Sequence, residues 1–260
     1  MAAGFRSHGI GSGDRVLVHV ENSIDSFVAA CSIPMTGATL VTSDVTFNEG
    51  GTFQLATPHD VCIGGGNISF YVCFTYVFFV ISIGATIVLL DNYSTMTDVF
   101  AAFRDHKANV VHATPTKLLE IVHEAKKAGQ CFPLVKKFTS LGTPMTKVTK
   151  SAIVAAFSPS ELRSCYGMTE VSGYLTAPPS GEITAGDVGF PVSGTRMKVV
   201  DPISGAVLSH NQRGEVLFHT RHIMVGYYKN PAETASFTTD DGWIRTGKDC
   251  EYQSLALFVA

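Results

Sequence analysis

Hydrophobic positions in the first two thirds of the chain follow two patterns that alternate along the sequence. Short runs rich in β-branched residues predict buried strands, and apolar residues spaced at i, i+3, i+4 and i+7 predict amphipathic helices. We expect strands at 15–20, 40–41, 109–112, 138–141 and 162–165. We expect helices that follow Asn22 or Ser23, follow Ser94 or Thr95, open at Pro115, and cover 146–157. This alternation predicts a mostly parallel sheet flanked by helices.

The pattern changes after Pro178. Alternating segments at 196–200 and 215–219 are separated by the turn-rich segments 201–205 and 211–214, which predicts antiparallel pairing. We therefore expect an α/β fold in which an α/β region over 1–180 is followed by a small antiparallel β region over 181–260.

One segment, 61–90, contains no charged residue, and 68–90 is almost wholly apolar. Its length meets the requirement for a membrane-spanning helix. The alternative is a buried helix followed by a buried strand over 85–90, with Gly84 between them. The β-branched and aromatic residues that crowd the run favour this second interpretation.

Composition and charge exclude several classes of protein. The chain is 45% hydrophobic and 16% charged, which is typical of a globular protein. Its formal net charge of −3 provides no basic field that would attract nucleic acid. None of the six cysteines forms a CxxC pair, so we expect buried thiols in a reducing compartment. The N-terminus lacks the apolar core of a signal peptide.

The strongest chemical signal is the segment 164–170, Ser-Cys-Tyr-Gly-Met-Thr-Glu. A buried strand ends in Tyr166, Gly167 permits a close backbone approach, and a hydroxyl and a carboxylate follow at Thr169 and Glu170. These groups can supply a ring for a base to stack on, a donor for a phosphate and an oxygen ligand for Mg²⁺. An ordinary strand-to-loop turn, with a capped helix after it, accounts for the segment equally well.

Further short motifs occur in a characteristic order and spacing. They are found at 13–16, 22–39, 83–86, 113–118, 186–191, 214–216, 226–231, 234 and 241–247. Together with 164–170, this series resembles the adenylate-forming family, which includes acyl-CoA synthetases, coumarate–CoA ligases and beetle luciferases. The resemblance spans nearly the whole chain and implies an incomplete version of the family's large domain, with 1–180 as its partial nucleotide- and acyl-binding region.

Members of that family activate a carboxylic acid with ATP, release pyrophosphate, and pass the acyl group to a thiol. The resemblance therefore implies ATP or AMP, Mg²⁺ and coenzyme A as cofactors, and a small carboxylic acid as substrate. It implies a cytoplasmic or peroxisomal location, although no C-terminal peroxisomal address is present. Tyr174, Leu175 and Phe190 suggest an apolar pocket for a fatty or aryl acid.

The resemblance also implies roles for particular residues. Tyr166 would lie against adenine beside Gly167, Thr169 would bond phosphate oxygens, and Glu170 would hold Mg²⁺, which makes Thr169 and Glu170 the candidate catalytic residues. The glycine-rich stretch that lines the adenine and acyl pocket would include Gly142, Thr143 and Pro144. Thr246 belongs to the motif that contacts the ribose.

The chain departs from the family pattern at three places. The phosphate-binding loop that ends in Pro-Lys-Gly is not found, and the sequence between about 48 and 67 passes over the region where it belongs. Lys248 stands where the family has the Asp that accepts hydrogen bonds from the ribose, and Asp249 comes one place later as a possible substitute. The chain ends at Ala260, before the family's C-terminal lid domain and its catalytic Lys.

These three differences from the family pattern all affect the release of pyrophosphate, so we expect adenylation to be severely impaired in this chain alone. Four alternatives stay open from the sequence. The chain is a non-catalytic remnant that binds adenine or acyl groups, a ligase complemented by another chain, a membrane-anchored protein that uses 61–90, or an incomplete gene product.

Overall fold

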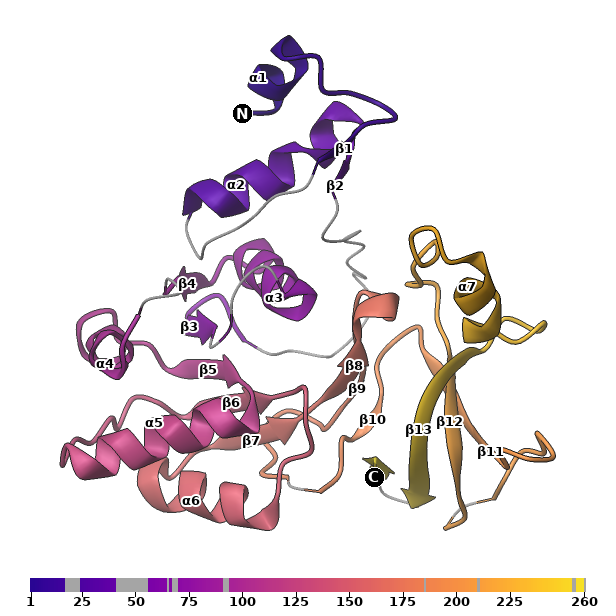
Figure 1. Cartoon of the computed structure of the whole chain (residues 1–260). Helices are drawn as coiled ribbons and strands as arrows, with labels where there is room; N and C mark the ends of the chain where they lie inside the picture. Colours follow the sequence, from indigo (N-terminus) through magenta and orange to yellow (C-terminus); the bar gives the residue numbers. More distant parts are fainter. Residues whose placement is uncertain are drawn as a thin grey trace. The chain divides into compact units, whose positions relative to one another are not determined.

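The computed structural model describes residues 1–16, 24–40, 56–64, 66, 70–90, 94–184, 186–209, 211–253 and 256–259. The chain divides into two compact units, of which one comprises 1–46 and 56–112 and the other comprises 113–260 (Figure 1). The boundary that the sequence suggests at 180 stays a prediction. Residues 17–20, 22, 23 and 48–55, on which parts of the sequence predictions fall, lie outside the described residues.

The first unit begins with a helical layer. Its elements, in chain order, are α1 (Ala2–Ser7), β1 (Arg15–Val16), α2 (Ile24–Ser32), η1 (Pro34–Thr36) and β2 (Thr39–Leu40). The short strands β1 and β2 pair in parallel. Phe27 of α2 packs against Phe74 with ring centroids 5.6 Å apart, inside a cluster that also contains Ile33 and Val77. Phe27 and Ala30 of α2 and Ile33 directly after it are buried and recur every third residue, as expected for one face of a helix.

The apolar run from 61 to 90 forms two strands and one helix. They are β3 (Val61–Gly64), α3 (Tyr71–Ser82) and β4 (Thr86–Val88). Phe74, Val77 and Val80 of α3 are buried. The helix of this interpretation is therefore confirmed. The strand that follows it is only part-buried, because β4 is an edge strand of its sheet and Thr86 is exposed. Among the described residues, no helix combines the length and the apolar character needed to cross a lipid bilayer.

The central sheet has five strands in the order β4-β3-β5-β6-β7, and it confirms the predicted mostly parallel sheet. The elements that complete it are α4 (Met96–Asp105), β5 (Val110–Ala113), α5 (Pro115–Lys127), β6 (Lys137–Ser140), α6 (Lys147–Phe157) and β7 (Glu161–Ser164). Each helix opens as the sequence predicts. Thr95 forms a capping box with Asp98, and the hydroxyls of Thr114 and Thr146 accept backbone N–H groups three residues on.

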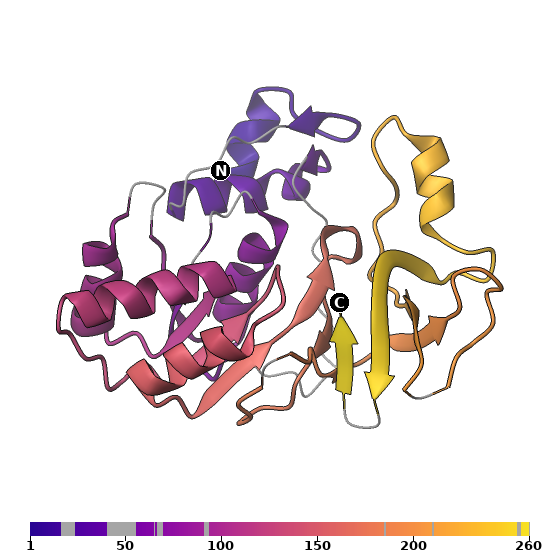
Figure 2. The same cartoon turned by 60° about the horizontal axis from the view of Figure 1, so that its bottom comes forward.

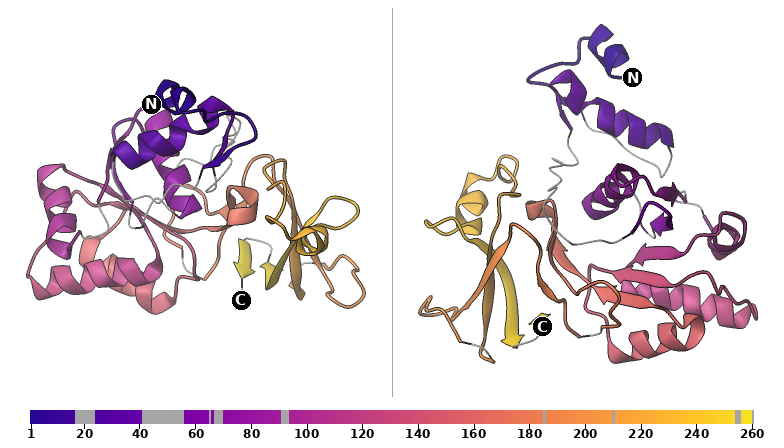
Figure 3. Two further views of the ribbon diagram at one scale, coloured as in Figure 1. Left: turned by 45° about the horizontal axis from the view of Figure 1, so that its top comes forward. Right: turned by 180° about the vertical axis from the view of Figure 1, so that it is seen from behind.

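Within the second unit, α5 packs beside α6, as Figure 3 shows from two sides. The adjacent strand β7 carries a buried ion pair between Arg163 and Glu161, with 2.8 Å between Nη2 and Oε1. The other Glu161 oxygen accepts the backbone N–H of Gly181 at 2.7 Å. Glu161 thus ties the strand to the loop that follows Pro178, and its pairing with Arg163 reduces the cost of burying the two charges.

Antiparallel pairing is found in two small sheets, the first of which begins before the predicted β region of 181–260. The first has the order β10-β9-β8 and is built from β8 (Tyr166–Met168), β9 (Gly173–Ala177) and β10 (Phe190–Pro191), with η2 (Thr169–Val171) between β8 and β9. The second has the order β11-β12-β13-β14 and is built from β11 (Arg196–Val200), β12 (Arg213–His219), β13 (Ile244–Gln253) and β14 (Ala256–Val259), with α7 (Pro231–Phe237) before β13. Figure 2 shows β13 and β14 running in opposite directions.

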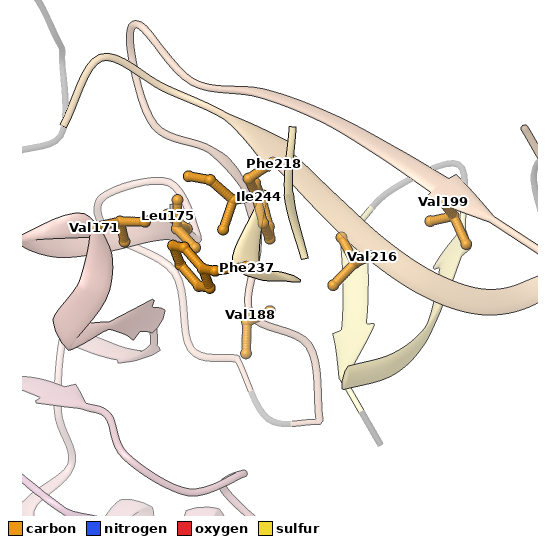
Figure 4. Packing of buried hydrophobic residues seen from close by; sticks show 8 residues of the cluster. All are labelled: Val171, Leu175, Val188, Val199, Val216, Phe218, Phe237 and Ile244. Atoms are coloured by element: carbon orange, nitrogen blue, oxygen red, sulfur yellow. The ribbon is translucent and has the colours of Figure 1, made fainter. Parts of the chain in front are cut away.

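A hydrophobic core joins the two small sheets within the second unit (Figure 4). Its buried members are Val171, Leu175, Val188, Val199, Val216, Phe218, Phe237 and Ile244. Phe218 of β12 lies opposite Ile244 of β13 in the antiparallel register, and both side chains are fully buried. The turn η2 is therefore anchored in this core through Val171, which fixes the residues on either side of it.

Candidate functional site

Strands β6 and β7 lead two of the predicted site segments to one edge of the sheet. The strands are parallel and in register, with Ser140 opposite Ser164, so their carboxyl ends lie together. Immediately after them, the backbone N–H of Cys165 donates to the carbonyl of Ser140 at 2.8 Å. The segment that begins at Gly142 and the segment that begins at Tyr166 thus leave the sheet from neighbouring strand ends, where α/β proteins commonly bind ligands.

The glycine-rich segment lies between β6 and α6. Gly142, Thr143 and Pro144 are all exposed, and Gly142 has φ near 92°, a left-handed conformation that favours glycine. A Cβ atom on Gly142 would lie 3.6 Å from Cγ2 of Thr114, an ordinary contact distance. The backbone conformation, rather than a lack of space, therefore accounts for glycine at this position.

Gly167 explains how the Tyr-Gly-Met segment turns. β8 pairs with β9 through a register shift between Tyr166 and Gly167. A Cβ atom on Gly167 would lie 2.0 Å from the carbonyl oxygen of Gly173, so no other residue fits without movement of the backbone. The close approach that the sequence suggests is made to the protein's own chain. After it comes the single 3-10 turn η2 and then strand β9, and the alternative expectation of a capped helix is wrong.

The Tyr166 ring is half-buried beside Phe218. Their ring centroids are 6.1 Å apart and their planes are inclined by 29°. Thr169, three residues later, is exposed, and Glu170 is half-buried. The four predicted residues from Tyr166 to Glu170 are therefore brought together on one strand and its following turn.

Glu170 has partners that the sequence analysis does not identify. Its Oε1 accepts a hydrogen bond from the phenol of Tyr227 at 2.9 Å, and its backbone carbonyl accepts the N–H of Met224 at 2.7 Å. Burial, followed by the hydrogen bond to Glu170 and the charge of that carboxylate, raises the pKa of Tyr227 to about 12. The phenol is thus protonated and remains a donor at neutral pH. The Gly-Tyr motif at 226–227 is visible in the sequence, but nothing local indicates its partner.

The motif at 246–249 is organised differently. Thr246 is buried, and its hydroxyl donates to the Val216 carbonyl at 2.8 Å while accepting the N–H of Lys248 at 3.1 Å. The N–H of Gly247 donates to Glu215 Oε1 at 3.2 Å. The Thr246 hydroxyl is therefore engaged within β12 and β13.

Lys248 and Asp249 are consecutive residues of β13, where side chains alternate between the two faces of the sheet. Lys248 is exposed. Asp249 lies opposite Glu215 in the register, and its side chain is outside the described part of the structure. A ribose contact from Asp249 stays a prediction.

The residues suggested for an acyl pocket separate into two groups. Leu175 is 1% exposed and belongs to the hydrophobic core together with Val171, so it serves packing. Tyr174 is half-buried and Phe190 is 38% exposed. Only the latter two present surface to which a ligand has access.

Within the described residues, no three His, Cys, Asp or Glu side chains gather into a metal-binding cluster. Glu170 is a single carboxylate at the tip of the Tyr166 segment. A Mg²⁺ ion bound with nucleotide commonly takes one or two protein carboxylates and completes its shell with phosphate oxygens and water. The donor present fits an ion of that kind.

Comparison with known proteins identifies the family. Residues 43–228 match the family model described as AMP-binding enzyme. The chain belongs to this family. It is 30% identical over 170 residues to 4-coumarate–CoA ligase 1 of Arabidopsis thaliana, a match that covers 64% of this chain and 30% of the relative. It is 28% identical over 153 residues to the luciferin 4-monooxygenase of Photuris pensylvanica, covering 59% and 28%. The chain thus matches about three tenths of the length of these relatives.

Solved structures of the AMP-binding fold agree with this assignment. A long-chain-fatty-acid–CoA ligase from Archaeoglobus fulgidus superposes with a TM-score of 0.86 at 16% identity, covering 100% of this chain and 74% of that one. The N-terminal domain of an enzyme from Mycobacterium tuberculosis gives 0.84 at 17% identity, covering 100% and 89%. At these identities the likeness shows the fold, and it confirms the expected α/β fold of the adenylate-forming large domain.

Proposed function

We propose that this AMP-binding family member is an acyl-activating ligase-type protein that binds an adenine nucleotide at the Tyr166–Glu170 segment but turns over very slowly by itself. The reaction type is ATP-dependent adenylation of a carboxylic acid followed by transfer to coenzyme A. The observation that carries the proposal is the Glu170 carboxylate, held at 2.9 Å by Tyr227 beside the exposed Thr169 hydroxyl.

Each residue of the segment has a role that its chemistry allows. Tyr166 offers an aromatic face to adenine, and Thr169 offers a hydroxyl donor to a phosphate oxygen. Glu170 offers a hard oxygen ligand to Mg²⁺, which when bound would neutralise phosphate charge. Gly142, Thr143 and Pro144 would border the same nucleotide from the end of β6.

We expect slow turnover because the sequence differs from the family pattern at the phosphate loop and at the ribose-binding Asp. No Pro-Lys-Gly phosphate loop occurs in the sequence, and Lys248 stands where an Asp would accept hydrogen bonds from the ribose. Positioned donors at a departing phosphate contribute several kcal/mol each, and about 1.4 kcal/mol corresponds to a factor of ten in rate. We therefore expect adenylation slower than in a complete ligase by several powers of ten.

The acid is proposed to be fatty or aryl. Tyr174 and Phe190 are apolar groups with accessible surface near the antiparallel sheet that contains Tyr166. The names of the relatives include both kinds of acid, a coumarate and a long-chain fatty acid. A panel of both is needed to choose between them.

Two measurements on the same preparation test this function. Calorimetric titration with AMP and with ATP should show saturable binding that Glu170→Gln weakens for Mg²⁺–ATP. Glu120→Gln, the same change at an exposed position of α5, should have no effect. Acid-dependent exchange of labelled pyrophosphate into ATP should stay near the blank.

The outcomes separate the alternatives. Absence of binding to either nucleotide at millimolar concentration would refute the nucleotide site. Exchange at the rate of an ordinary ligase would refute the impairment. Binding with no exchange, even at high protein concentration, would favour the non-catalytic remnant over a slow ligase.

A further inference from the structure

Tyr227 and Glu170 are separated by 57 positions in sequence, but they are joined by a hydrogen bond. The Tyr227 phenol donates to one oxygen of the Glu170 carboxylate, Oε1. We propose that Tyr227 is a positioning residue, which fixes the Glu170 carboxylate with Oε1 engaged and Oε2 presented to the divalent cation of a bound nucleotide. This inference rests on the proposed function, because it assigns a positioning residue to Glu170, the proposed cation ligand of that site.

The turn that carries Glu170 is fixed at two levels by the segment 224–227. The N–H of Met224 donates to the Glu170 carbonyl at 2.7 Å, which holds the main chain. The Tyr227 phenol holds the side chain at 2.9 Å. One contact sets where the residue is, and the other sets how its carboxylate is rotated.

Tyr227 is itself held by helix α7. Its backbone N–H donates to the Thr234 hydroxyl at 2.9 Å, and that hydroxyl donates to the Asn230 carbonyl at 2.8 Å. The Asn230 side chain caps the helix by accepting the N–H of Glu233 at 3.2 Å. The Tyr227 ring packs against Phe237 with centroids 6.0 Å apart and planes at 70°. A capped helix thus fixes both the backbone and the ring of the donor.

The charges suit a carboxylate that binds a cation. The Tyr227 phenol occupies one lone pair of Oε1. Among the described residues, no donor is found within hydrogen-bonding distance of Oε2, so that oxygen keeps both lone pairs available. Mg²⁺ accepts a single carboxylate oxygen when phosphate oxygens and water supply its other ligands. A carboxylate already oriented avoids the entropy loss of being fixed on binding.

A purely structural role for Tyr227, as a link between η2 and α7, predicts a different result. Loss of a structural link would disturb every ligand of the site alike. Loss of a positioning contact would weaken the cation-dependent part of binding and leave cation-free binding as it was. The test therefore compares cation-dependent binding with cation-free binding in the same set of variants.

The experiment uses the full chain with Mn²⁺ as a paramagnetic probe for the cation, and measures binding of Mn²⁺–ATP and of AMP in excess chelator. Tyr227→Phe keeps the ring and removes the hydroxyl, and we expect it to weaken Mn²⁺–ATP binding about tenfold while AMP binding changes less than twofold. Tyr228→Phe makes the same change on the exposed neighbouring residue and should leave both affinities unchanged. Adding Tyr227→Phe to Glu170→Gln should cause no further loss.

Variants of Thr234 test the next contact, in which the Thr234 hydroxyl accepts the Tyr227 backbone N–H. Thr234→Val removes the acceptor of the Tyr227 N–H, and we expect a loss of Mn²⁺–ATP binding smaller than that of Tyr227→Phe. Thr234→Ser keeps the hydroxyl and should restore wild-type affinity. Equal losses of AMP and Mn²⁺–ATP in Tyr227→Phe, or no loss of either, would overturn the positioning role.

Failure of the underlying nucleotide site gives a distinct result. If the wild-type chain binds neither ligand, the proposed function is wrong. The Tyr227–Glu170 hydrogen bond is then tested by unfolding equilibria of the wild type, Tyr227→Phe, Glu170→Gln and the double variant. An interacting pair should give a coupling of about fivefold in the unfolding constant. Additive effects would show that the phenol does not hold the carboxylate.

Discussion

The Tyr166–Glu170 segment lies within one family motif and the Thr246–Asp249 segment begins at the end of another, and their hydroxyl groups are used in opposite ways. The first leaves the Thr169 hydroxyl exposed and orients Glu170 from outside the motif. The second buries the Thr246 hydroxyl in bonds to Val216 and Lys248. A motif hydroxyl can therefore stay accessible in one segment and be used by the β-sheet in the other.

The difference follows from local geometry. Gly167 lets the backbones of β8 and β9 approach closely, and Thr169 in the turn η2 that follows is exposed. Thr246 lies at an irregularity in the pairing of β12 and β13, where its side-chain hydroxyl reaches the carbonyl of Val216. Position in the sheet, rather than residue type, decides which hydroxyl a ligand can reach.

The largest expected effect comes from removing the side chain that supports both segments. Phe218 is fully buried, lies beside Tyr166 and is opposite Ile244 in register. Phe218→Ala should lower the free energy of unfolding by about 3–5 kcal/mol, measured by denaturant titration. Ile203→Ala, on a residue that is 95% exposed, should change it by less than about 0.5 kcal/mol. Similar effects of the two variants would contradict a shared core.

A pH titration provides a reference from outside both segments. Burial lowers the pKa of His112 from 6.5 to about 3. The His112 ring stacks on the Tyr76 ring with centroids 3.9 Å apart. Between these values the unfolded chain binds the additional proton, so the stability is complete above pH 6.5 and is lost as pH falls toward 3. The slope should approach about 1.4 kcal/mol per pH unit and should disappear in His112→Phe. A slope that survives the substitution would assign the effect to another group.

The Thr246 hydroxyl should matter for stability rather than for binding. Thr246→Val removes the donor to the Val216 carbonyl, and we expect a loss of about 1–2 kcal/mol in unfolding free energy with little change in AMP affinity. Thr246→Ser should recover most of the loss in thermal unfolding experiments. Weaker AMP binding in a fully folded Thr246→Val protein would show that the second segment contacts nucleotide directly.

The smallest effect is expected from restoring an acceptor at position 248. Lys248→Asp places a carboxylate on the exposed end of the second segment, and AMP binding measured by calorimetry should tighten severalfold, worth about 1 kcal/mol. Lys126→Asp on α5 is the matched control for the change in net charge. An equal gain from both variants would mean that only overall charge matters.

Local signals predict much of this fold. The caps at Thr95, Thr114 and Thr146 and the apolar spacing behind them identify α4, α5 and α6, because those interactions lie within one or two turns. The site is only half predictable. Tyr166 to Glu170 are contiguous and therefore visible, whereas the Tyr227–Glu170 bond depends on how two distant segments pack.

Other parts depended on pairing that sequence patterns do not encode. β8 is a three-residue strand with a register shift, which leaves no alternation to detect. Leu175 has the composition of a pocket residue, and only the packing of η2 against α7 and β12 places it in the core. Residue types suggested the chemistry, while long-range packing decided which side chains are accessible.

The central claim is that AMP is bound by the first segment and not by the second. Hydrogen–deuterium exchange with and without saturating AMP tests it most directly. The account predicts slower exchange at 142–144, 166–171 and 224–227, with little change at 246–249. Protection confined to 246–249, or no protection at 166–171 under saturation, would contradict it.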